Sequence, residues 1–429
     1  MRISMILPGI VAVLLLFALP AAASDFTLGV FGNANEDDTI NMQDVTYTEL
    51  IILEYRDQTE LSDAKYDGKI NMQDVTQIEL VILGKEKELT LLQYMGYPPD
   101  LTEKPVTVPM PVERMVVLSN FAAETVCAFE AADKIVGVIE GSKMRGETRT
   151  LLGDTPSVGT GHDITHGGFD MEKVLELNPD IVLTYSYTYS PETDEQLNAA
   201  GIPLVHADFS QPEKHPYEIR NLGWLLGNRE RAEELISFEK DHTDIIKERV
   251  KDLEPEERTK AYYCLGVSYY GDPTHVAGGG TAHHNNIELC GGTNIFADVD
   301  GYVGVDAEEI IVRNPEVIIA MAWSSATGEA LGYDITDTGP VDEVRTEYIM
   351  NYFGFDHIDA VRDDRVYFIS SDASSTHQSV WLSYLAKYLH PTLFEDVDPA
   401  AIHKEWFETF LGVEYQGVYA YPTPWTEEN

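Results

Sequence analysis

Two loops with oxygen-bearing side chains at regular spacing are the first candidates for chemistry in this chain. The first loop runs from Asn33 to Asp44 and the second from Asp63 to Asp74. Oxygen side chains fall at most of positions 1, 3, 5, 9 and 12 of each loop, and an apolar run follows. This spacing gathers hard oxygen ligands around one point, as a calcium ion with about six to eight ligands requires. The sequence therefore predicts two calcium loops, each leading into a helix.

The two loops belong to an internal repeat. The motif Asn-Met-Gln-Asp-Val-Thr occurs at 41–46 and again at 71–76. Residues 28–84 resemble dockerin modules, which carry two such loops with Asp at the last position. The resemblance implies these calcium ligands: Asn33, Asn35, Asp37, the Thr39 carbonyl, Asn41 and Asp44 in loop one, and Asp63, Asp67, the Lys69 carbonyl, Asn71 and Asp74 in loop two. It also implies a cohesin-like partner protein at the cell surface.

Three positions depart from the dockerin pattern. Asp38 stands where Gly usually permits the turn, and Asn33 replaces a stronger Asp ligand. Lys65 occupies a ligand position of loop two, where its ammonium could repel the ion or replace part of its charge. The alternative interpretation of both loops is an acidic, solvated turn without a metal.

Beyond about residue 101, short apolar strands alternate with helices. Strands are predicted at 115–118 and 135–139, and a helix at 171–177 turns through Asn178-Pro179-Asp180 into another strand. Such alternation indicates parallel sheets covered by helices on both faces. A long stretch at 229–253 has helical apolar spacing and contains neither Gly nor Pro. The second half echoes the first, because residues 172–183 align with 308–319 at an offset of 136. The sequence therefore predicts two Rossmann-like α/β lobes joined by one long helix.

The lobes resemble the periplasmic binding proteins of iron–siderophore, haem and cobalamin ABC importers. The resemblance spans about residues 101–413 and includes the segments 112–119 and 171–182, the Gly291-Gly292-Thr293-Asn294 turn and the segment 384–391. It implies that the interlobe helix restricts hinge motion, and that one exposed Glu on each lobe docks onto the permease. Glu172 and Glu308 are the matching residues. The alternative is that both are acids at helix N-termini, stabilised there by the helix dipole.

A ligand is expected between the lobes, at the carboxyl ends of the parallel strands. The segments that leave these strands are rich in aromatic residues, which suits a large, partly apolar chelate. The predicted cleft residues are Ser119, Asn120, Phe121, Lys143, Arg145, Arg149, Tyr185, Tyr187, Tyr269, Tyr270, His283, His284, Trp323, Ser371 and Asp372. Lys143, Arg145 and Arg149 could receive an anionic ferric chelate, or they could be ordinary loop charges. His283 or His284 could cap a bound haem or corrinoid, although a solvated helix start is the simpler interpretation.

Composition and the chain's N-terminal residues limit where the protein acts. Lys and Arg number 29 against 73 Asp and Glu, a formal net charge of −44, so nucleic-acid binding is excluded as a first interpretation. Residues 1–23 have the pattern of a secretory signal, with an aliphatic run before Ala21-Ala22-Ala23. The alternative is an uncleaved membrane anchor. We therefore expect a secreted or surface-held protein.

Cysteine usage adds little to this assignment. Cys127 lies in an apolar helical pattern, so we expect it to be buried and inert. Cys264 and Cys290 could form a disulfide bond, but their spacing does not require one.

The sequence predicts the following domains: a signal peptide at 1–23, a dockerin-like domain at 25–90, a linker at 91–111, an N-terminal lobe at 112–225, an interlobe helix at 226–256, a C-terminal lobe at 257–413 and a tail at 414–429. The predicted function is capture of an iron chelate for an ABC importer, without catalysis. Cobalamin, haem or an oxyanion is the alternative ligand. A protein that binds a surface partner through the calcium module is an alternative from a different functional class. A hydrolase is disfavoured because neither a Gly-x-Ser-x-Gly nor a His-Glu-x-x-His motif occurs.

Overall fold

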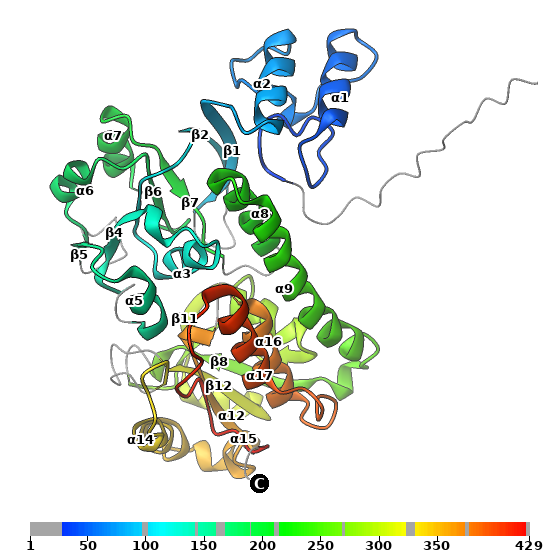
Figure 1. Cartoon of the computed structure of the whole chain (residues 1–429). Helices are drawn as coiled ribbons and strands as arrows, with labels where there is room; N and C mark the ends of the chain where they lie inside the picture. Colours follow the sequence, from blue (N-terminus) through cyan, green and yellow to red (C-terminus); the bar gives the residue numbers. More distant parts are fainter. Residues whose placement is uncertain are drawn as a thin grey trace, which may run out of the picture.

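The computed structural model describes residues 28–96, 102–141, 145–159, 168–188, 190–209, 214–267, 271–322, 331–373 and 377–425. The predicted signal segment lies outside the described residues, as do the predicted cleft residues Lys143, Tyr269, Tyr270 and Trp323. Figure 1 shows a small N-terminal module above two α/β lobes, with one long helix running along the side of the molecule between the lobes.

The N-terminal module is built from the sequence repeat. Its helices are α1 (Met42–Ile52) and α2 (Met72–Ile82), and a 3-10 turn, η1 (Glu60–Ser62), lies between them. Both helices begin with the same capping box, in which Asn41 or Asn71 caps the helix and Asp44 or Asp74 bonds back to the cap. The repeated motif therefore encodes a loop and a capped helix twice.

Two strands occupy most of the described part of the stretch predicted as a linker. Residues 88–109 contain an antiparallel hairpin of β1 (Glu88–Met95) and β2 (Thr102–Pro109). Pro105 and Pro109 lie on β2, which is largely exposed and pairs only with β1 among the described strands. An edge strand tolerates proline because one side of it needs no ladder hydrogen bond. Pro105 and Pro109 therefore lie on an edge strand, into which the Pro-rich stretch was predicted to lead.

The N-terminal lobe has the predicted parallel sheet. Its strand order is β5-β4-β3-β6-β7, and every pairing is parallel. The strands are β3 (Met115–Val117), β4 (Ile135–Ile139), β5 (Ser157–Gly159), β6 (Ile181–Thr184) and β7 (Leu204–His206). The accompanying helices are α3 (Asn120–Ala128), α5 (Gly146–Leu152), α6 (Met171–Leu177), α7 (Pro191–Ala199) and α8 (His215–Leu226), with the 3-10 turn η2 (Ala132–Lys134).

One long helix, α9 (Arg229–Val250), connects the lobes, as the sequence predicts. At about 1.5 Å per residue, its length is roughly 33 Å. The buried carboxyl of Glu239 accepts hydrogen bonds from the backbone N–H and hydroxyl of Ser379, at 2.7 and 3.0 Å, which ties the middle of α9 to the C-terminal lobe. Burial raises the pKa of Glu239 to about 8.

The C-terminal lobe has the predicted parallel strands at the centre of its sheet, and antiparallel strands extend the sheet at both edges. Its strand order is β11-β9-β8-β12-β13-β14, with β10 also paired to β8. The parallel centre consists of β10 (Gly292–Asn294), β8 (Thr259–Cys264), β12 (Val317–Ala322) and β13 (Val366–Ser370). The antiparallel strands are β9 (His275–Ala277), β11 (Tyr302–Gly304) and β14 (Ala420–Tyr421). The predicted C-terminal tail thus supplies an edge strand.

Helices cover this second sheet. They are α11 (Ala282–Leu289), α12 (Ala307–Arg313), α14 (Gly339–Arg345), α15 (Asp359–Arg362), α16 (Gln378–Leu389) and α17 (Pro399–Trp406). Short turns complete the lobe: η4 (Pro255–Glu257), η5 (Thr346–Met350), η6 (Phe355–His357), η7 (Ser371–Ala373) and η8 (Phe407–Leu411).

The structure also shows the state of the three cysteines. Cys127, Cys264 and Cys290 are all buried free thiols, so the possible disulfide between Cys264 and Cys290 does not form. Burial raises the pKa of the Cys127 and Cys264 thiols to about 12, which keeps them protonated. In the part of the chain that the structure describes, every helix is too short or too polar to cross a bilayer.

Candidate ligand site between the lobes

Residues that follow the carboxyl ends of the strands meet between the two lobes. Ser119 follows β3, Tyr185 follows β6, and Ser371 follows β13 in the opposite lobe. Ser119 is fully buried and caps α3, because its hydroxyl accepts the N–H of Ala122 at 3.1 Å. The carboxyl ends therefore carry the site, as expected for open α/β sheets.

Three aromatic rings of the N-terminal lobe lie at this junction. Phe121 and Tyr185 meet edge to face with ring centroids 5.9 Å apart, and Tyr187 stacks on Tyr185 at 5.0 Å. The Tyr185 hydroxyl donates a hydrogen bond to the side chain of Asn120. Burial raises the pKa of Tyr185 to about 12, so the phenol remains a neutral donor. The structure thus brings together four predicted cleft residues, the three aromatic residues Phe121, Tyr185 and Tyr187 and the hydrogen-bonded Asn120.

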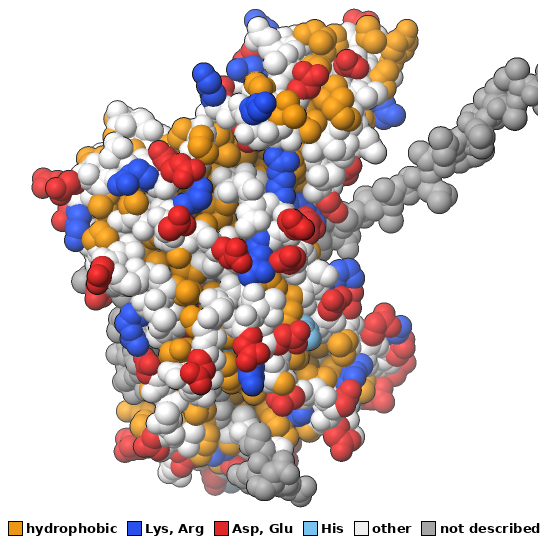
Figure 2. All heavy atoms as spheres, viewed as in Figure 1, with side chains coloured by type: hydrophobic (Ala, Val, Ile, Leu, Met, Phe, Trp, Pro, Cys, Tyr) orange, Lys and Arg blue, Asp and Glu red, His pale blue; other side chains and the backbone are white. Residues whose placement is uncertain are grey.

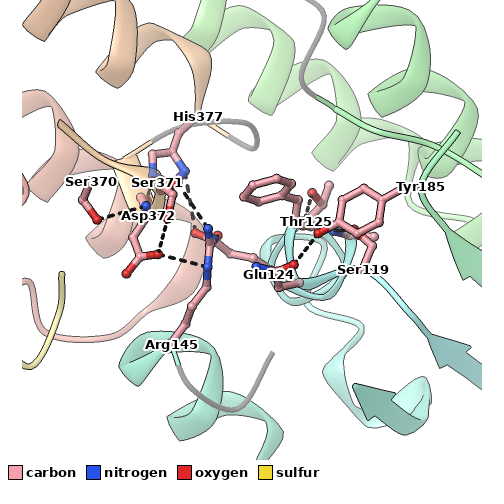
Figure 3. A network of polar contacts seen from close by, with 12 residues as sticks. Ser119, Glu124, Thr125, Arg145, Tyr185, Ser370, Ser371, Asp372 and His377 are labelled. Carbon is pink, nitrogen blue, oxygen red and sulfur yellow. Dashed lines mark hydrogen bonds and ion pairs between the residues drawn. The ribbon is translucent and has the colours of Figure 1, made fainter. Parts of the chain in front are cut away.

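Arg145 forms ion pairs with acidic residues of both lobes. Its guanidinium lies 2.8 Å from Glu124 on its own lobe and 3.1 Å from Asp372 on the other lobe. It also donates to the Ser371 carbonyl at 3.2 Å, and its Cζ lies 4.7 Å from the centroid of the Phe121 ring. Figure 3 shows Arg145 reaching from the end of α5 between these partners. Only 5 % of Arg145 is exposed, so the ion pairs are shielded from water.

Carboxyl groups outnumber arginines around Arg145. Glu124 is fully buried, and Glu147 is buried with neither oxygen hydrogen-bonded to any described residue. The pKa of Glu147 is well above its usual value, first because of burial and then because Asp372 and Glu124 carry like charge. Burial and the neighbouring like charges therefore favour the protonated form of Glu147.

His377 completes the polar network (Figure 3). Its Nδ1 lies 3.6 Å from Glu124, and its Nε2 lies 2.8 Å from the Asp372 carbonyl. Burial lowers the pKa of His377 to about 3, with the nearby charge of Arg145 as the next cause. The imidazole is therefore neutral and adds no positive charge to the site.

The two described members of the predicted basic cluster are both paired with acidic residues. Arg149 also pairs across the lobes, with its guanidinium 2.8 Å from Asp334. Arg145 and Arg149 are thus both held by carboxylates of the opposite lobe, and Lys143 lies outside the described residues. The sequence showed the arginines but gave no sign of their partners, because Asp334 and Asp372 are distant in the chain.

The two predicted histidines are engaged within the C-terminal lobe. His283 stacks on Tyr263 with centroids 3.8 Å apart, and its Nδ1 lies 2.9 Å from the Tyr302 hydroxyl. Burial lowers the pKa of His283 to about 3. His284 lies at the start of α11, where its Nδ1 is 3.2 Å from the Asn294 amide. These contacts favour a packing role over metal ligation.

Sequence reasoning missed Glu124, Glu147, Asp334 and His377. Glu124 left a usable signal, because it is a single acid within the apolar run from Ala122 to Ala128. A charged residue on a buried helix face requires a partner of opposite charge. The other three residues sit in polar segments where nothing in the local sequence distinguishes them.

The two predicted docking residues occupy equivalent places. Glu172 lies in the first turn of α6 and Glu308 in the first turn of α12, and both are exposed. Each helix ends at an Asn with a left-handed φ of 46°, Asn178 or Asn314, before turning into a parallel strand. The segments that align at an offset of 136 residues in the sequence therefore also have the same local structure.

The two acidic loops share one pattern of hydrogen bonds. The buried carboxylate of Asp44 accepts the N–H groups of Asn35 and Asn41, at 3.2 and 2.8 Å. Asp74 accepts the corresponding groups of Lys65 and Asn71, at 3.0 and 2.8 Å. Burial, opposed by these bonds, raises the pKa of Asp44 to about 6, and burial also raises the pKa of Asp74.

Whether these loops suit calcium depends on their oxygen atoms. No three His, Cys, Asp or Glu side chains converge into a metal cage within the described ranges. The predicted ligands of loop one are largely amide and carbonyl oxygens, which do not belong to His, Cys, Asp or Glu side chains. The ionised carboxylate of Asp44 also has lone pairs that its two hydrogen bonds do not use, and these could bind an ion. In loop two, the Lys65 ammonium lies 3.4 Å from Glu88 on β1. The donor set of loop one therefore fits calcium better than that of loop two.

The N-terminal module is fixed to the N-terminal lobe through polar contacts. Arg220 on α8 lies 3.2 Å from Asp38 in loop one and forms a two-pronged ion pair with Glu233 on α9, at 2.8 and 3.1 Å. Gly29 donates its N–H to Asn221 at 3.0 Å, and a Cβ at this position would clash with the Tyr217 hydroxyl. Asp38, which departs from the dockerin pattern, thus has a structural role at this contact.

The fold and site together define a class of protein: two α/β lobes, joined by one helix, that face each other at the carboxyl ends of their strands. Residues 115–373 match the family described as "Periplasmic binding protein". The chain belongs to this family, whose members deliver ligands to ABC permeases from outside the cytoplasm and are binding proteins rather than enzymes.

Individual relatives differ in what they bind. The vitamin B12-binding protein of Yersinia pestis is 25% identical over 214 residues, which cover 50% of this chain and 71% of the relative. A TroA-like periplasmic binding protein from Veillonella parvula has a TM-score of 0.62 at 23% identity and covers 73% of this chain and 96% of its own. A molybdate-binding protein of Haemophilus influenzae has a TM-score of 0.58 at 20% identity. The match covers 73% of this chain and 97% of that protein. The structural similarities support the fold alone.

Proposed function

We propose that this protein captures an iron chelate between its lobes and delivers it to the permease of an ABC importer. The observation that carries this proposal is the group of Phe121, Tyr185 and Tyr187 at the strand ends, next to a polar bridge between the lobes. Aromatic walls with a few placed polar groups are typical of sites for large, partly apolar ligands. Vitamin B12 in a relative and molybdate in a structural neighbour make a corrinoid and an oxyanion the competing ligands.

Delivery is proposed to depend on Glu172 and Glu308. Both side chains are exposed on equivalent helices, one in each lobe, so both can meet basic pockets on a permease. The experiment is uptake of radiolabelled iron by source cells that carry the double variant Glu172→Gln and Glu308→Gln. We expect uptake to fall by about tenfold or more while ligand binding by the purified protein stays unchanged.

A matched control separates docking from a general charge effect. Glu176 is exposed on the same short helix as Glu172, so Glu176→Gln removes one charge without touching the proposed contact. Normal uptake by the control and reduced uptake by the double variant support docking. Full uptake by the double variant would contradict it.

Calcium is proposed as a structural ion of the N-terminal module, chiefly in loop one. The buried Asp44 carboxylate and the oxygen side chains of Asn33, Asn35 and Asp37 support this assignment. When bound, the ion would supply positive charge next to the buried carboxylate of Asp44. Asp44→Ala is expected to abolish stabilisation by added calcium, and an unchanged melting response would reject the site.

A surface interaction through the module is the second candidate function. Figure 2 shows apolar side chains gathered over α1 and α2. The exposed apolar residues of the module are Met42, Leu53, Tyr55, Tyr66, Met72 and Leu83. Met42 and Met72, like Leu53 and Leu83, occupy equivalent places in the repeat. This repeated surface favours a protein partner, and a cohesin-like protein is the candidate to test in a pull-down with calcium and with chelator.

A further inference from the structure

We infer that the C-terminal lobe contacts the permease through an apolar patch, formed by Val312 and Phe353, beside the proposed docking residue Glu308. This inference rests on the proposed function and adds a specific contact to it. The side chains of Val312 and Phe353 are 82% and 94% exposed, the highest values among the large apolar side chains of the described residues. Single exposed apolar residues are ordinary, whereas apolar side chains that gather at one place indicate an interaction site.

Val312 shares a helix face with Glu308. Both residues are exposed on α12, and Val312 lies four positions after Glu308. Residues four apart on a helix are neighbours, with about 5–6 Å between their Cβ atoms. A protein surface that docks on Glu308 is therefore within reach of Val312.

Phe353 lies beside the last turn of the same helix. The next residue, Gly354, packs so closely on α12 that a Cβ added to it would stand 2.8 Å from Cδ1 of Ile311. Gly354 also has a φ of 85°, a conformation that favours glycine. The chain therefore brings Phe353 next to Ile311 and Val312, and the two exposed side chains belong to one patch.

The loop that carries Phe353 is packed on both sides of this residue. Phe355 is fully buried, its ring centroid lies 4.9 Å from that of Tyr352, and its N–H donates to the Tyr352 carbonyl at 3.0 Å. A few residues later, the N–H of Ala360 donates to the carbonyl of Pro315, just after α12, at 3.0 Å. The exposure of Phe353 is therefore a feature of a packed loop.

The equivalent helix of the N-terminal lobe has a different surface. At the offset of 136 residues, Val312 corresponds to Glu176, which is exposed on α6. An exposed acid thus follows Glu172 by one turn, whereas an exposed apolar residue follows Glu308. The permease should therefore offer an apolar surface next to the basic pocket that receives the C-terminal lobe.

Charge favours the permease over a lipid membrane or a second copy of this chain. Glu308 and Asp356 are exposed acids within four positions of Val312 and Phe353 in the sequence. Both Arg313 on α12 and Arg362 on α15 are paired with carboxylates. The exposed acids would repel anionic lipid headgroups and the same patch on a second copy, but basic pockets attract them.

The N-terminal module does not lie near this patch. Figure 1 shows α12 and α15 at the end of the molecule opposite to α1 and α2. A partner of the module and the permease would therefore occupy separate surfaces of the protein.

The test is photo-crosslinking in the cells that make the protein, which does not depend on the identity of the ligand. The photoreactive residue p-benzoylphenylalanine replaces Phe353 in the full chain. Ile245, 42% exposed on α9, receives the same replacement as a matched control. We expect position 353 to crosslink to the transmembrane subunit of the permease at least about tenfold more than position 245, with the product identified by mass spectrometry.

A second measurement tests the neighbours of position 353. In the chain with the photoreactive residue at 353, Val312→Ser and Glu308→Gln should each lower the yield of the permease crosslink several-fold, because each removes part of the same contact. Ile245→Ser changes an exposed apolar residue elsewhere and should leave the yield unchanged. Equal losses from Val312→Ser and Ile245→Ser would overturn the role of the patch.

A crosslinker in the N-terminal lobe separates this inference from the proposed function. Leu175, 40% exposed on α6, lies one turn after Glu172 and reports docking of that lobe independently. Capture of the permease from position 175 but not from position 353 would overturn the inference and leave the proposed function standing. Capture of lipid or of a second copy of this chain at position 353, in place of the permease, would also overturn it. Failure of both positions to capture the permease would contradict the inference and the proposed docking together.

Discussion

Replacement of Arg145 by Met should destabilise the protein far more than an average substitution. The guanidinium lies 2.8 Å from Glu124 and 3.1 Å from Asp372, and its removal leaves these carboxylates facing Glu147 without a cation. Breaking a buried ion pair from one side typically costs about 3–5 kcal/mol, because a buried charge is left uncompensated. We therefore expect Arg145→Met to lower the free energy of unfolding by about 3–5 kcal/mol. Urea denaturation followed by tryptophan fluorescence at pH 7.5 measures this loss.

Arg149 provides a matched control for this prediction. It also pairs across the lobes, but its side chain is 50% exposed and that of its partner Asp334 is 40% exposed. Exposed ion pairs contribute about 0–1 kcal/mol, so Arg149→Met should have a small effect. Adding Asp372→Asn to Arg145→Met should restore part of the lost stability. Losses below about 1 kcal/mol for both single variants would refute the view that Arg145 neutralises buried acids.

Three further predictions concern the module and the interlobe helix. The pKa of Asp44 rises from 3.8 to about 6 on folding, so calcium-free protein should lose about 3 kcal/mol of stability between these pH values as pH rises. Thermal melting in the presence of a calcium chelator, repeated across this pH range, should show the loss for the wild type and for the control Asp57→Asn, but not for Asp44→Asn. A wild-type melting temperature that does not change with pH in this range would contradict the prediction. Folding raises the pKa of Glu239 from 4.5 to about 8, so the wild-type protein should lose stability relative to Glu239→Gln as pH rises through this range. Urea denaturation of both proteins at pH 5 and pH 9 measures this change. If Glu239 were ionised at both pH values, the difference in stability between the two proteins would be the same at pH 5 and at pH 9. Arg220→Ala breaks the contact between loop one and α9, so hydrogen exchange around Asp38 should speed up, whereas unchanged exchange would show that the contact is dispensable.

Strands and helices of the lobes were predictable where local pattern and turn chemistry agree. Ile135–Ile139 and Met171–Leu177 form with the predicted bounds, because an apolar run or a helical pattern ends at a clear turn signal. Asn178 and Asn314 adopt the left-handed conformation that ends the two equivalent helices. The repeat of 136 residues therefore predicted the repeated architecture without any knowledge of contacts.

The remaining features depend on contacts between distant segments. Residues 91–111 were predicted as a linker that leads into an edge strand, but the prolines gave no sign of the pairing between β1 and β2 or of the contact between Gln93 and His206. The edge strands of the C-terminal sheet are short and come from separate parts of the chain. Likewise, the role of Arg145 follows from Glu124 and Asp372, which are 21 and 227 positions away in the sequence.

Native mass spectrometry tests the central claim most directly. The full chain would be purified without denaturation from the cells that make it, beside the variant Tyr185→Ala. We predict that the wild-type protein retains one small molecule, with the mass of a metal chelate or corrinoid, and that the variant loses it. A wild-type chain that carries no small molecule, or a variant that retains the molecule as firmly, would contradict a ligand site between the lobes.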